Sequence, residues 1–194
     1  MTRKQLIFAV CSAAVVLAIP SVVRADIHTL RPTPADLGDL DHGVYVTWGV
    51  DWSVPTGEEI IAATLAIENL NDWTVEDDDI IYMHLLDEAL PGVHSWTDHQ
   101  GGGDAFEGQG VLLTTFSDDD GSPNAPEDWS YSFTPAQIDA LTDYAADGHF
   151  GLGFDPDCHY YNDGVSLTVQ TASIPEPASM VLLAAGTLFV NRRR

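Results

Sequence analysis

The sequence predicts an all-β protein, an antiparallel β-sandwich of jelly-roll type that carries one short helix. Several short segments alternate apolar and polar residues with a period of two, as half-buried strands do. Glycine, proline, asparagine and aspartate separate these segments at short intervals, which is typical of sandwiches and barrels. Only one segment combines the start and stop signals of a helix. The 194 residues show no internal repeat, and they suffice to bury one ordinary core.

In the first half of the chain, prolines and aspartates predict an irregular lead-in over residues 26–42. Strict alternation from Val44 to Val54 then predicts a strand, which either continues through Gly49 or breaks there into two strands or a bulge. A Pro-Thr-Gly turn follows, and alternation over 61–67 predicts a second strand. The side chains expected to face the core are Val44, Val46, Trp48, Val50, Trp52, Val54, Ile61, Ala63, Leu65 and Ile67.

The second half is expected to contain the remaining strands and the helix. Apolar segments predict strands at 80–86, 111–116, 129–133, 150–154 and 165–169, and the glycine-rich segment 87–109 is expected to be a long loop. Thr134 is the expected N-cap of the helix, with Pro135 at its first position. Its inner face should carry Ile138, Leu141 and Ala145, and Gly148 should end it.

The C-terminal segment 173–194 is built differently. It contains the triplet Pro175, Glu176 and Pro177, an uncharged apolar run over 178–190, and the terminal residues Arg192, Arg193 and Arg194. The prolines hold the triplet extended. As a helix, the apolar run would span about 20 Å, less than the hydrocarbon core of roughly 30 Å, with the arginines on the cytoplasmic side. The alternative, a buried element of the domain, leaves three arginines without a partner.

The order of triplet, apolar run and arginines resembles the PEP-CTERM sorting signal of Gram-negative bacteria. The resemblance implies that a hydrophobic sorting helix inserts transiently into the membrane. It also implies that an exosortase, a membrane protease, processes the chain near the triplet. Proteins with this signal are commonly associated with the cell surface, exopolysaccharide and biofilm, so the resemblance implies an address and no particular activity.

The N-terminus is predicted to be a signal peptide. Arg3 and Lys4 precede an apolar run too short for a permanent anchor, and cleavage is expected between Ala25 and Asp26. The chain then divides into a signal peptide (1–25), an acidic β-sandwich ectodomain (26–172) and a sorting segment (173–194). We expect export across the inner membrane to the envelope, and from there to the cell surface or extracellular matrix.

Between these signals the chain is strongly acidic. Residues 26–173 contain 29 acidic residues against one basic residue, Arg31, a formal charge of −28. Such a domain repels phosphate, which excludes nucleic acid as a partner. The acids form a solvated surface suited to a salty medium or bind cations, and both interpretations can hold. Cys158 is the only cysteine of the expected mature chain, so it forms no intramolecular disulfide and should be buried.

The loop over 155–164 is the most distinctive internal segment. Its hard oxygen ligands suit calcium, although the spacing is not that of an EF-hand. The candidate calcium ligands are Asp155, Asp157, Asn162 and Asp163. The alternative is a hairpin loop in which these side chains accept backbone hydrogen bonds. His159, Tyr160 and Tyr161 either present aromatic faces to a sugar or pack beneath the loop.

Other groups of residues indicate a metal or catalytic site less strongly than this loop does. The acidic clusters 76–79 and 118–120 are interpreted as solvated turns. A zinc site would have to use His94, Asp98, His99 and Asp104, whose spacing matches no established pattern. The sequence contains neither a Gly-x-Ser-x-Gly nor a His-Glu-x-x-His motif, and with 29 acids any glycosidase pair is arbitrary. We therefore expect no enzymatic activity.

Three functions follow from these observations. The first is a structural or interaction protein of the surface or matrix. The second is a carbohydrate-binding module that is stabilised by calcium and binds an extracellular polysaccharide. The third is a secreted hydrolase. An exposed row of Trp96, Tyr160 and Tyr161 would favour the second, and a cleft with two facing carboxylates and a perturbed pKa would favour the third.

Overall fold

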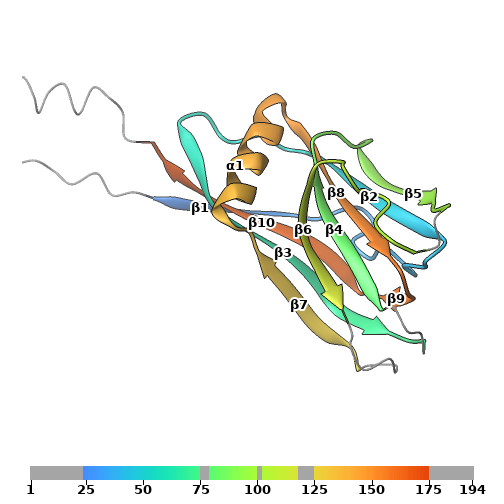
Figure 1. Ribbon diagram of the computed structural model, residues 1–194. Coiled ribbons are helices and arrows are strands. Elements are labelled where there is room, and N and C mark those ends of the chain that lie inside the picture. The colour runs from blue at the N-terminus through green and yellow to red at the C-terminus, as the bar shows by residue number, and fades with distance from the viewer. Residues whose placement is uncertain (1–23, 75–78, 100–101, 118–124, 175–194) are drawn as a thin grey trace, which may run out of the picture. The chain divides into compact units, whose positions relative to one another are not determined.

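Two antiparallel sheets face each other in the computed structural model, which describes residues 24–74, 79–99, 102–117 and 125–174 (Figure 1). Most of the predicted signal peptide and nearly all of the sorting segment lie outside the described residues. The strands are β1 (Ala25–Leu30), β2 (Val44–Asp51), β3 (Glu58–Asp72), β4 (Ile80–Leu86), β5 (Gly92–Thr97), β6 (Val111–Ser117), β7 (Glu127–Ser132), β8 (His149–Pro156), β9 (Tyr160–Tyr161) and β10 (Gly164–Ser173). Helix α1 (Pro135–Tyr144) and the 3-10 turn η1 (Ala145–Asp147) lie between β7 and β8.

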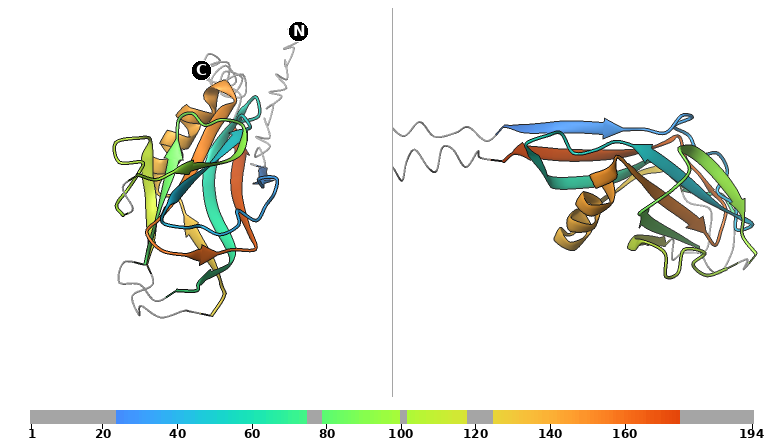
Figure 2. Two further views of the ribbon diagram at one scale, coloured as in Figure 1. Left: turned by 90° about the vertical axis from the view of Figure 1, so that its right-hand side faces the viewer. Right: turned by 90° about the horizontal axis from the view of Figure 1, so that it is seen from above.

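The strand order confirms the predicted sandwich. One sheet has the order β1-β10-β3-β7, with β9 paired to the end of β3, and the other has the order β5-β2-β8-β4-β6. Consecutive strands such as β2, β3 and β4, or β6, β7 and β8, alternate between the sheets, as strands of a jelly roll do. Figure 2 shows the two layers from the side and from above.

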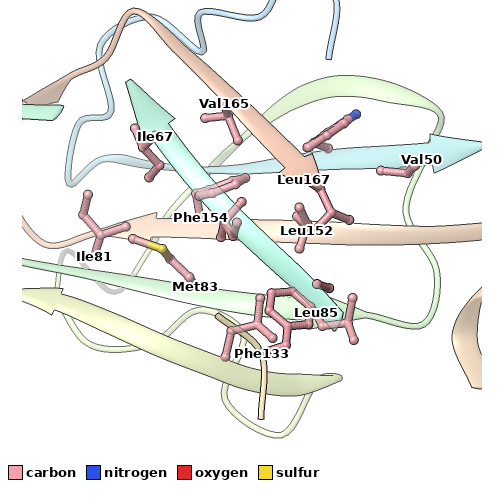
Figure 3. Close-up of a cluster of buried hydrophobic side chains, with 14 of the residues drawn as sticks. Val50, Ile67, Ile81, Met83, Leu85, Phe133, Leu152, Phe154, Val165 and Leu167 are labelled. Atoms are coloured by element: carbon pink, nitrogen blue, oxygen red, sulfur yellow. The ribbon is translucent and has the colours of Figure 1, made fainter. Parts of the chain in front are cut away.

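The core lies between the sheets and is apolar. Ile67 from β3 and Leu167 from β10 face Ile81, Met83 and Leu152 from the other sheet (Figure 3). All five side chains are fully buried. Each such burial stabilises the fold by about 1.5–3 kcal/mol. The period-two alternation of the sequence therefore reflects the burial of one face of each strand.

The alternation also predicted β2, although the strand ends at Asp51 and not at Val54, and the structure decides the role of Gly49. Val46, Trp48 and Val50 are buried, and the strand runs through Gly49 without a break. A Cβ atom at Gly49 would lie 2.2 Å from the carbonyl oxygen of Leu90. Glycine is needed here because the 89–91 segment crosses the strand closely.

The sequence-based assignment was wrong for two edge strands. Residues 25–30 form β1, where an irregular lead-in was expected, and the expected long loop contains β5. Each pairs with one neighbour only, β1 with β10 and β5 with β2. Ile27 in β1 is 67% exposed and Trp96 in β5 is 38% exposed. Edge strands that bury little of either face lack the apolar alternation on which the prediction depends.

The prediction was also wrong for Ile61 and for the length of β3. Pairing between β3 and β10 shifts register between Gln170 and Thr171, which pair with Ala62 and Ile60. The bulge moves Ile60 into the core and leaves Ile61 48% exposed, because one extra residue reverses the side of the strand that a side chain faces. Beyond residue 67 the strand continues to Asp72 and buries Leu70.

Helix α1 begins as predicted, but the α-helix ends at Tyr144, and the 3-10 turn η1 continues the chain to Gly148. The Thr134 hydroxyl accepts a hydrogen bond from the Gln137 amide, and the Gln137 side chain accepts one from the Thr134 amide, which completes a capping box. Leu141 and Ala145 are buried on its inner face, with Ile138 partly buried. After η1, Gly148 adopts a φ of 95°, the left-handed conformation that ends helices.

Candidate functional site

Three segments that are distant in the sequence meet around β9. Tyr160 and Leu40 exchange backbone hydrogen bonds of 2.9 Å, which attaches the lead-in to β9. On its other side β9 pairs with the end of β3, Tyr161 opposite Asn71. The loop before β2, the end of β3 and the segment after β9 are therefore held side by side.

These segments enclose a polar groove of about 620 Å³. Carboxylates and amides dominate its lining, which consists of Asp36, Gly38, Asp39, Asn69, Asn71, Pro126, Tyr161, Asn162 and Asp163. Such side chains offer several acceptors and amide donors at short spacing. The lining therefore suits a ligand that is rich in hydroxyl groups.

An aromatic pair stands at the edge of the groove. The rings of Trp73 and Tyr161 stack at a centroid distance of 5.3 Å, with 14° between their planes. Trp73 is 39% exposed and Tyr161 is 48% exposed. The Trp73 indole N–H donates to Asp39 Oδ1 at 3.3 Å, which orients the ring. Trp73 also packs against His159 at a centroid distance of 4.9 Å, so the pair places two partly exposed aromatic rings beside polar groups.

Two of the predicted calcium ligands organise this groove. Asn162 is buried, accepts a hydrogen bond from the Leu37 amide and donates one to the Gly38 carbonyl, both at 3.1 Å. Asp163 accepts a hydrogen bond of 2.6 Å from the Asn69 side chain. Both side chains therefore hold loop segments together through protein contacts.

The other two predicted ligands face a different loop. Asp155 Oδ2 accepts from the Ala105 amide at 2.6 Å, and Asp157 Oδ2 accepts from the Gly103 amide at 3.0 Å. Among the described residues, Asp155, Asp157 and Asp163 do not form a cluster with ligand atoms within 4.8 Å. The structure thus separates the four candidate ligands into two pairs with different neighbours.

Asp155 has an unusual electrostatic environment. Its side chain is fully buried, and Oδ1 accepts no hydrogen bond from any described residue. The pKa of Asp155 is raised to about 7, chiefly by burial; the hydrogen bond from the Ala105 amide lowers it, and the nearby carboxylates of Asp98, Asp157 and Asp104 raise it. Asp155 does not line the groove.

Cys158 is buried, as expected, and it lies among acidic side chains. Its sulfur lies 3.2 Å from the Thr74 hydroxyl and 3.5 Å from Asp72 Oδ1. Burial raises the pKa of the thiol, and a hydrogen bond with Asp79 raises it further. This pKa makes Cys158 a poor nucleophile at neutral pH. Asp79 is itself buried, so the expectation of a solvated turn was wrong for this residue; 76–78 and 118–120 lie outside the described residues.

The row of Trp96, Tyr160 and Tyr161 that would favour a carbohydrate-binding module is not formed. Tyr160 is fully buried, whereas Trp96 lies on β5, where its indole N–H donates to the Thr47 hydroxyl at 2.9 Å. Trp96 stacks on Tyr45, and the partner of Tyr161 is Trp73. Trp73 was not among the residues that the sequence pattern indicated, because it lies in a polar and acidic segment. The sequence feature that could have indicated it is a tryptophan among polar residues, directly after a segment with strand alternation.

Two of the four residues considered for zinc contact other parts of the chain. His94 Nε2 lies 3.1 Å from the Pro91 carbonyl oxygen. Asp104 Oδ2 lies 2.9 Å from His84 Nε2, a partner that the sequence did not indicate. Within the described part of the chain, His94, Asp98, His99 and Asp104 form no cluster of ligand atoms.

The residues of the predicted signal cleavage site lie at the start of β1. Ala25 pairs with Ala172 and Asp26 with Thr171. Cleavage between them would leave the rest of β1 intact, and it stays a prediction. None of the described helices is long and apolar enough to span a bilayer.

Comparison with known proteins identifies the C-terminal segment. Residues 173–194 match the family model of the PEP-CTERM protein-sorting motif, over the range predicted from the sequence. The search of curated proteins returned no match to the chain. The matched range contains Pro175, Glu176 and Pro177 and the three terminal arginines. This chain is therefore an exported protein that carries a PEP-CTERM sorting motif and reaches the cell envelope or surface through an exosortase.

Proposed function

We propose that this exported protein is a surface- or matrix-associated interaction protein that binds a neutral polysaccharide in the groove beside β9. The observation that carries this proposal is the stacked pair of Trp73 and Tyr161 next to a lining of carboxylates and amides. A pyranose ring has an apolar face for an aromatic surface and hydroxyl groups for polar side chains. Binding sites commonly combine such a surface with a few polar groups that fix orientation.

The charge of the domain narrows the class of polysaccharide. Asp36, Asp39 and Asp163 line the groove, and only one basic residue accompanies the 29 acids of 26–173. The negative electrostatic potential of these acids would repel uronates and sulfated sugars. A neutral chain instead donates its hydroxyl protons to the carboxylates, which are strong acceptors.

The location of Asp155, the carboxyl whose pKa is raised, supports binding without catalysis. The criterion for a hydrolase was a cleft that contains two facing carboxylates, one of them with a perturbed pKa. The pKa of Asp155 is raised to about 7, but Asp155 is fully buried and is not among the residues that line the groove. This favours a binding protein over the hydrolase.

Affinity electrophoresis in gels that contain neutral polysaccharides tests the proposal. Wild-type protein should be retarded by at least one neutral polysaccharide and not by an anionic one. Trp73→Ala and Tyr161→Ala should abolish the retardation. Trp96→Ala is the matched control, since Trp96 is similarly exposed but lies on β5, and it should bind like wild type. Equal retardation of all variants, or none of the wild type, would contradict the proposal.

We also propose that Ca²⁺ stabilises the fold through Asp155 and Asp157, a revised form of the site expected from the sequence. The supporting observation is the buried Oδ1 of Asp155, which lacks a hydrogen bond among the described residues and lies in the field of three other aspartates. Calcium prefers such carboxylate oxygens. Asn162 and Asp163 are not included because they bond to the groove segments.

Thermal melts of the full chain at fixed high salt test this proposal, with Ca²⁺ and then with chelator. A cation that binds only the folded state raises the melting temperature, by several degrees at concentrations far above its Kd. The shift should disappear in Asp155→Asn and persist in Asp163→Asn. A shift of the same size in Asp155→Asn, or no shift in the wild type, would overturn it.

A further inference from the structure

Two histidines and an aspartate converge where the lead-in meets the segment before β9. Ligand atoms of Asp41, His42 and His159 all lie within 4.8 Å of one another. None of the three lines the groove described above. His159 came from the distinctive loop of the sequence, but Asp41 and His42 precede it by more than a hundred positions.

The backbone bridge between Leu40 and Tyr160 explains why these residues meet. The bridge is antiparallel, so Asp41 lies opposite His159 and Asp39 lies opposite Tyr161. Leu40 and Tyr160 point into the core and are fully buried. Their neighbours therefore point the other way, and Asp39 and Asp41 lie on either side of His159.

A turn then brings His42 to the same place. The Val44 amide donates to the Asp41 carbonyl oxygen at 2.9 Å, which closes the turn over residues 42 and 43. The rings of His42 and His159 meet edge to face, with centroids 4.9 Å apart. The Asp41 carboxylate also accepts the Gly43 amide at 2.9 Å, which fixes its direction.

The spacing of the ligand atoms is close to that of a tetrahedral zinc site. Asp41 Oδ1 lies 3.7 Å from His42 Nδ1 and 4.0 Å from His159 Nε2. Ligand atoms about 2.0–2.1 Å from a tetrahedral zinc ion are roughly 3.4 Å apart. A contraction of a few tenths of an ångström, on the order of ordinary side-chain motion, would bring these two distances to that spacing, and the ligand atoms of His42 and His159 lie within 4.8 Å of each other.

A carboxylate lies behind one of the histidines. Asp39 Oδ1 is 3.9 Å from His159 Nδ1, and this nitrogen is buried and makes no hydrogen bond to a described residue. Histidines that bind metal through one nitrogen usually donate the other N–H to a carboxylate or carbonyl. Asp39 is itself held by the Trp73 indole N–H.

We propose that Asp41, His42 and His159 bind a Zn²⁺ ion, with Asp39 as the positioning residue for the His159 ring. Two imidazole nitrogens and one carboxylate oxygen are ligands that zinc accepts, and three protein ligands leave a fourth position for water. His42 and Asp41 are each 44% exposed, so the ion can enter from solvent. The high negative charge of the domain raises the local cation concentration. The competing interpretation is a protonated His159 that only forms ion pairs with Asp39 and Asp41.

Calorimetric titration of the metal-free full chain with ZnCl₂ tests the site. The wild type should bind one Zn²⁺ ion at this site with high affinity. His159→Gln and His42→Gln should each weaken this affinity at least tenfold, and Asp39→Asn should weaken it by about ten- to hundredfold through the lost orientation. Co²⁺ bound in place of Zn²⁺ should give the visible absorption of a four-coordinate ion, and this absorption should be lost in His42→Gln.

Two controls keep the result interpretable. His149→Gln removes the histidine of an exposed pair, His149 Nδ1 to Asp51 Oδ1 at 2.8 Å, and it should bind zinc like the wild type. Melting temperatures without metal show whether each variant folds, and His42 in its exposed turn is the least disruptive substitution. Absence of tight binding by the wild type, or unchanged affinity in the folded His42→Gln variant, would leave only the ion pairs and overturn the proposal.

Discussion

Asp155 is a carboxyl group at the end of β8 that is buried with one oxygen bonded to the Ala105 amide. Its pKa is raised to about 7, chiefly because burial disfavours the charged form. Folding therefore favours the protonated carboxyl. The stability that this group contributes is fully present below pH 4, the range of an ordinary carboxyl, and is lost as pH rises through 7.

The residue-scale prediction concerns Asp155→Asn, which keeps an acceptor for Ala105 and cannot ionise. In the presence of chelator, the wild type should lose stability relative to this variant by up to about 1.4 kcal/mol per pH unit between pH 4 and 7. Urea unfolding of both proteins at several pH values measures the difference. A difference that does not change with pH would show that Asp155 titrates normally.

At the scale of elements, one buried glutamine joins α1 to both sheets. Besides its part in the capping box, Gln137 donates to the carbonyl oxygens of Leu113 at 2.8 Å and Leu112 at 3.2 Å in β6. Its Oε1 accepts from the Tyr131 hydroxyl in β7 at 3.1 Å. The helix is therefore positioned by polar contacts as well as by Leu141, and the sequence indicated only the latter.

We predict that Gln137→Met destabilises the fold much more than loss of the cap hydroxyl does. Methionine has a similar volume but leaves the buried Leu113 carbonyl without its donor, so the free energy of unfolding should fall by about 2–4 kcal/mol. Thr134→Ala should cost about 1 kcal/mol. Thr142→Ala, which removes a bond on the exposed face of α1, is the control and should change little. If denaturant unfolding gives Gln137→Met the same free energy of unfolding as Thr142→Ala, the prediction is wrong.

At the scale of the whole molecule, the sorting motif begins where the last described strand of the sandwich ends. Residues 173–194 match the motif, and the described strands end at Ser173. The matched range contains the Pro175-Glu176-Pro177 triplet, near which the motif implies processing by an exosortase. The first two residues of the matched range still belong to the sandwich, because Ser173 pairs with Glu58 and the Ile174 amide donates to the Gly57 carbonyl oxygen at 2.8 Å.

Replacement of the triplet by three alanines should therefore leave the chain exported but unprocessed. In a host that contains an exosortase, immunoblots should show the larger precursor in the membrane fraction and loss of the processed form. Ser179→Ala, within the apolar run, is the control and should be processed normally. Normal processing of the triple-alanine variant would contradict sorting through this motif.

The sequence by itself determined the strands of the core, the helix with its cap, and the sorting motif. These features are local: burial of one strand face imposes alternation, a cap needs neighbouring residues, and a sorting motif is recognised as a linear peptide. The edge strands β1 and β5, the bulge at Ile61 and the groove were decided by long-range pairing. Two backbone contacts, Leu40 with Tyr160 and Asn71 with Tyr161, join segments from three parts of the chain. They separate Asp155 from Asp163 and bring His42 to His159, because which loops meet depends on the pairing of distant strands and not on the order of residues within any one of them.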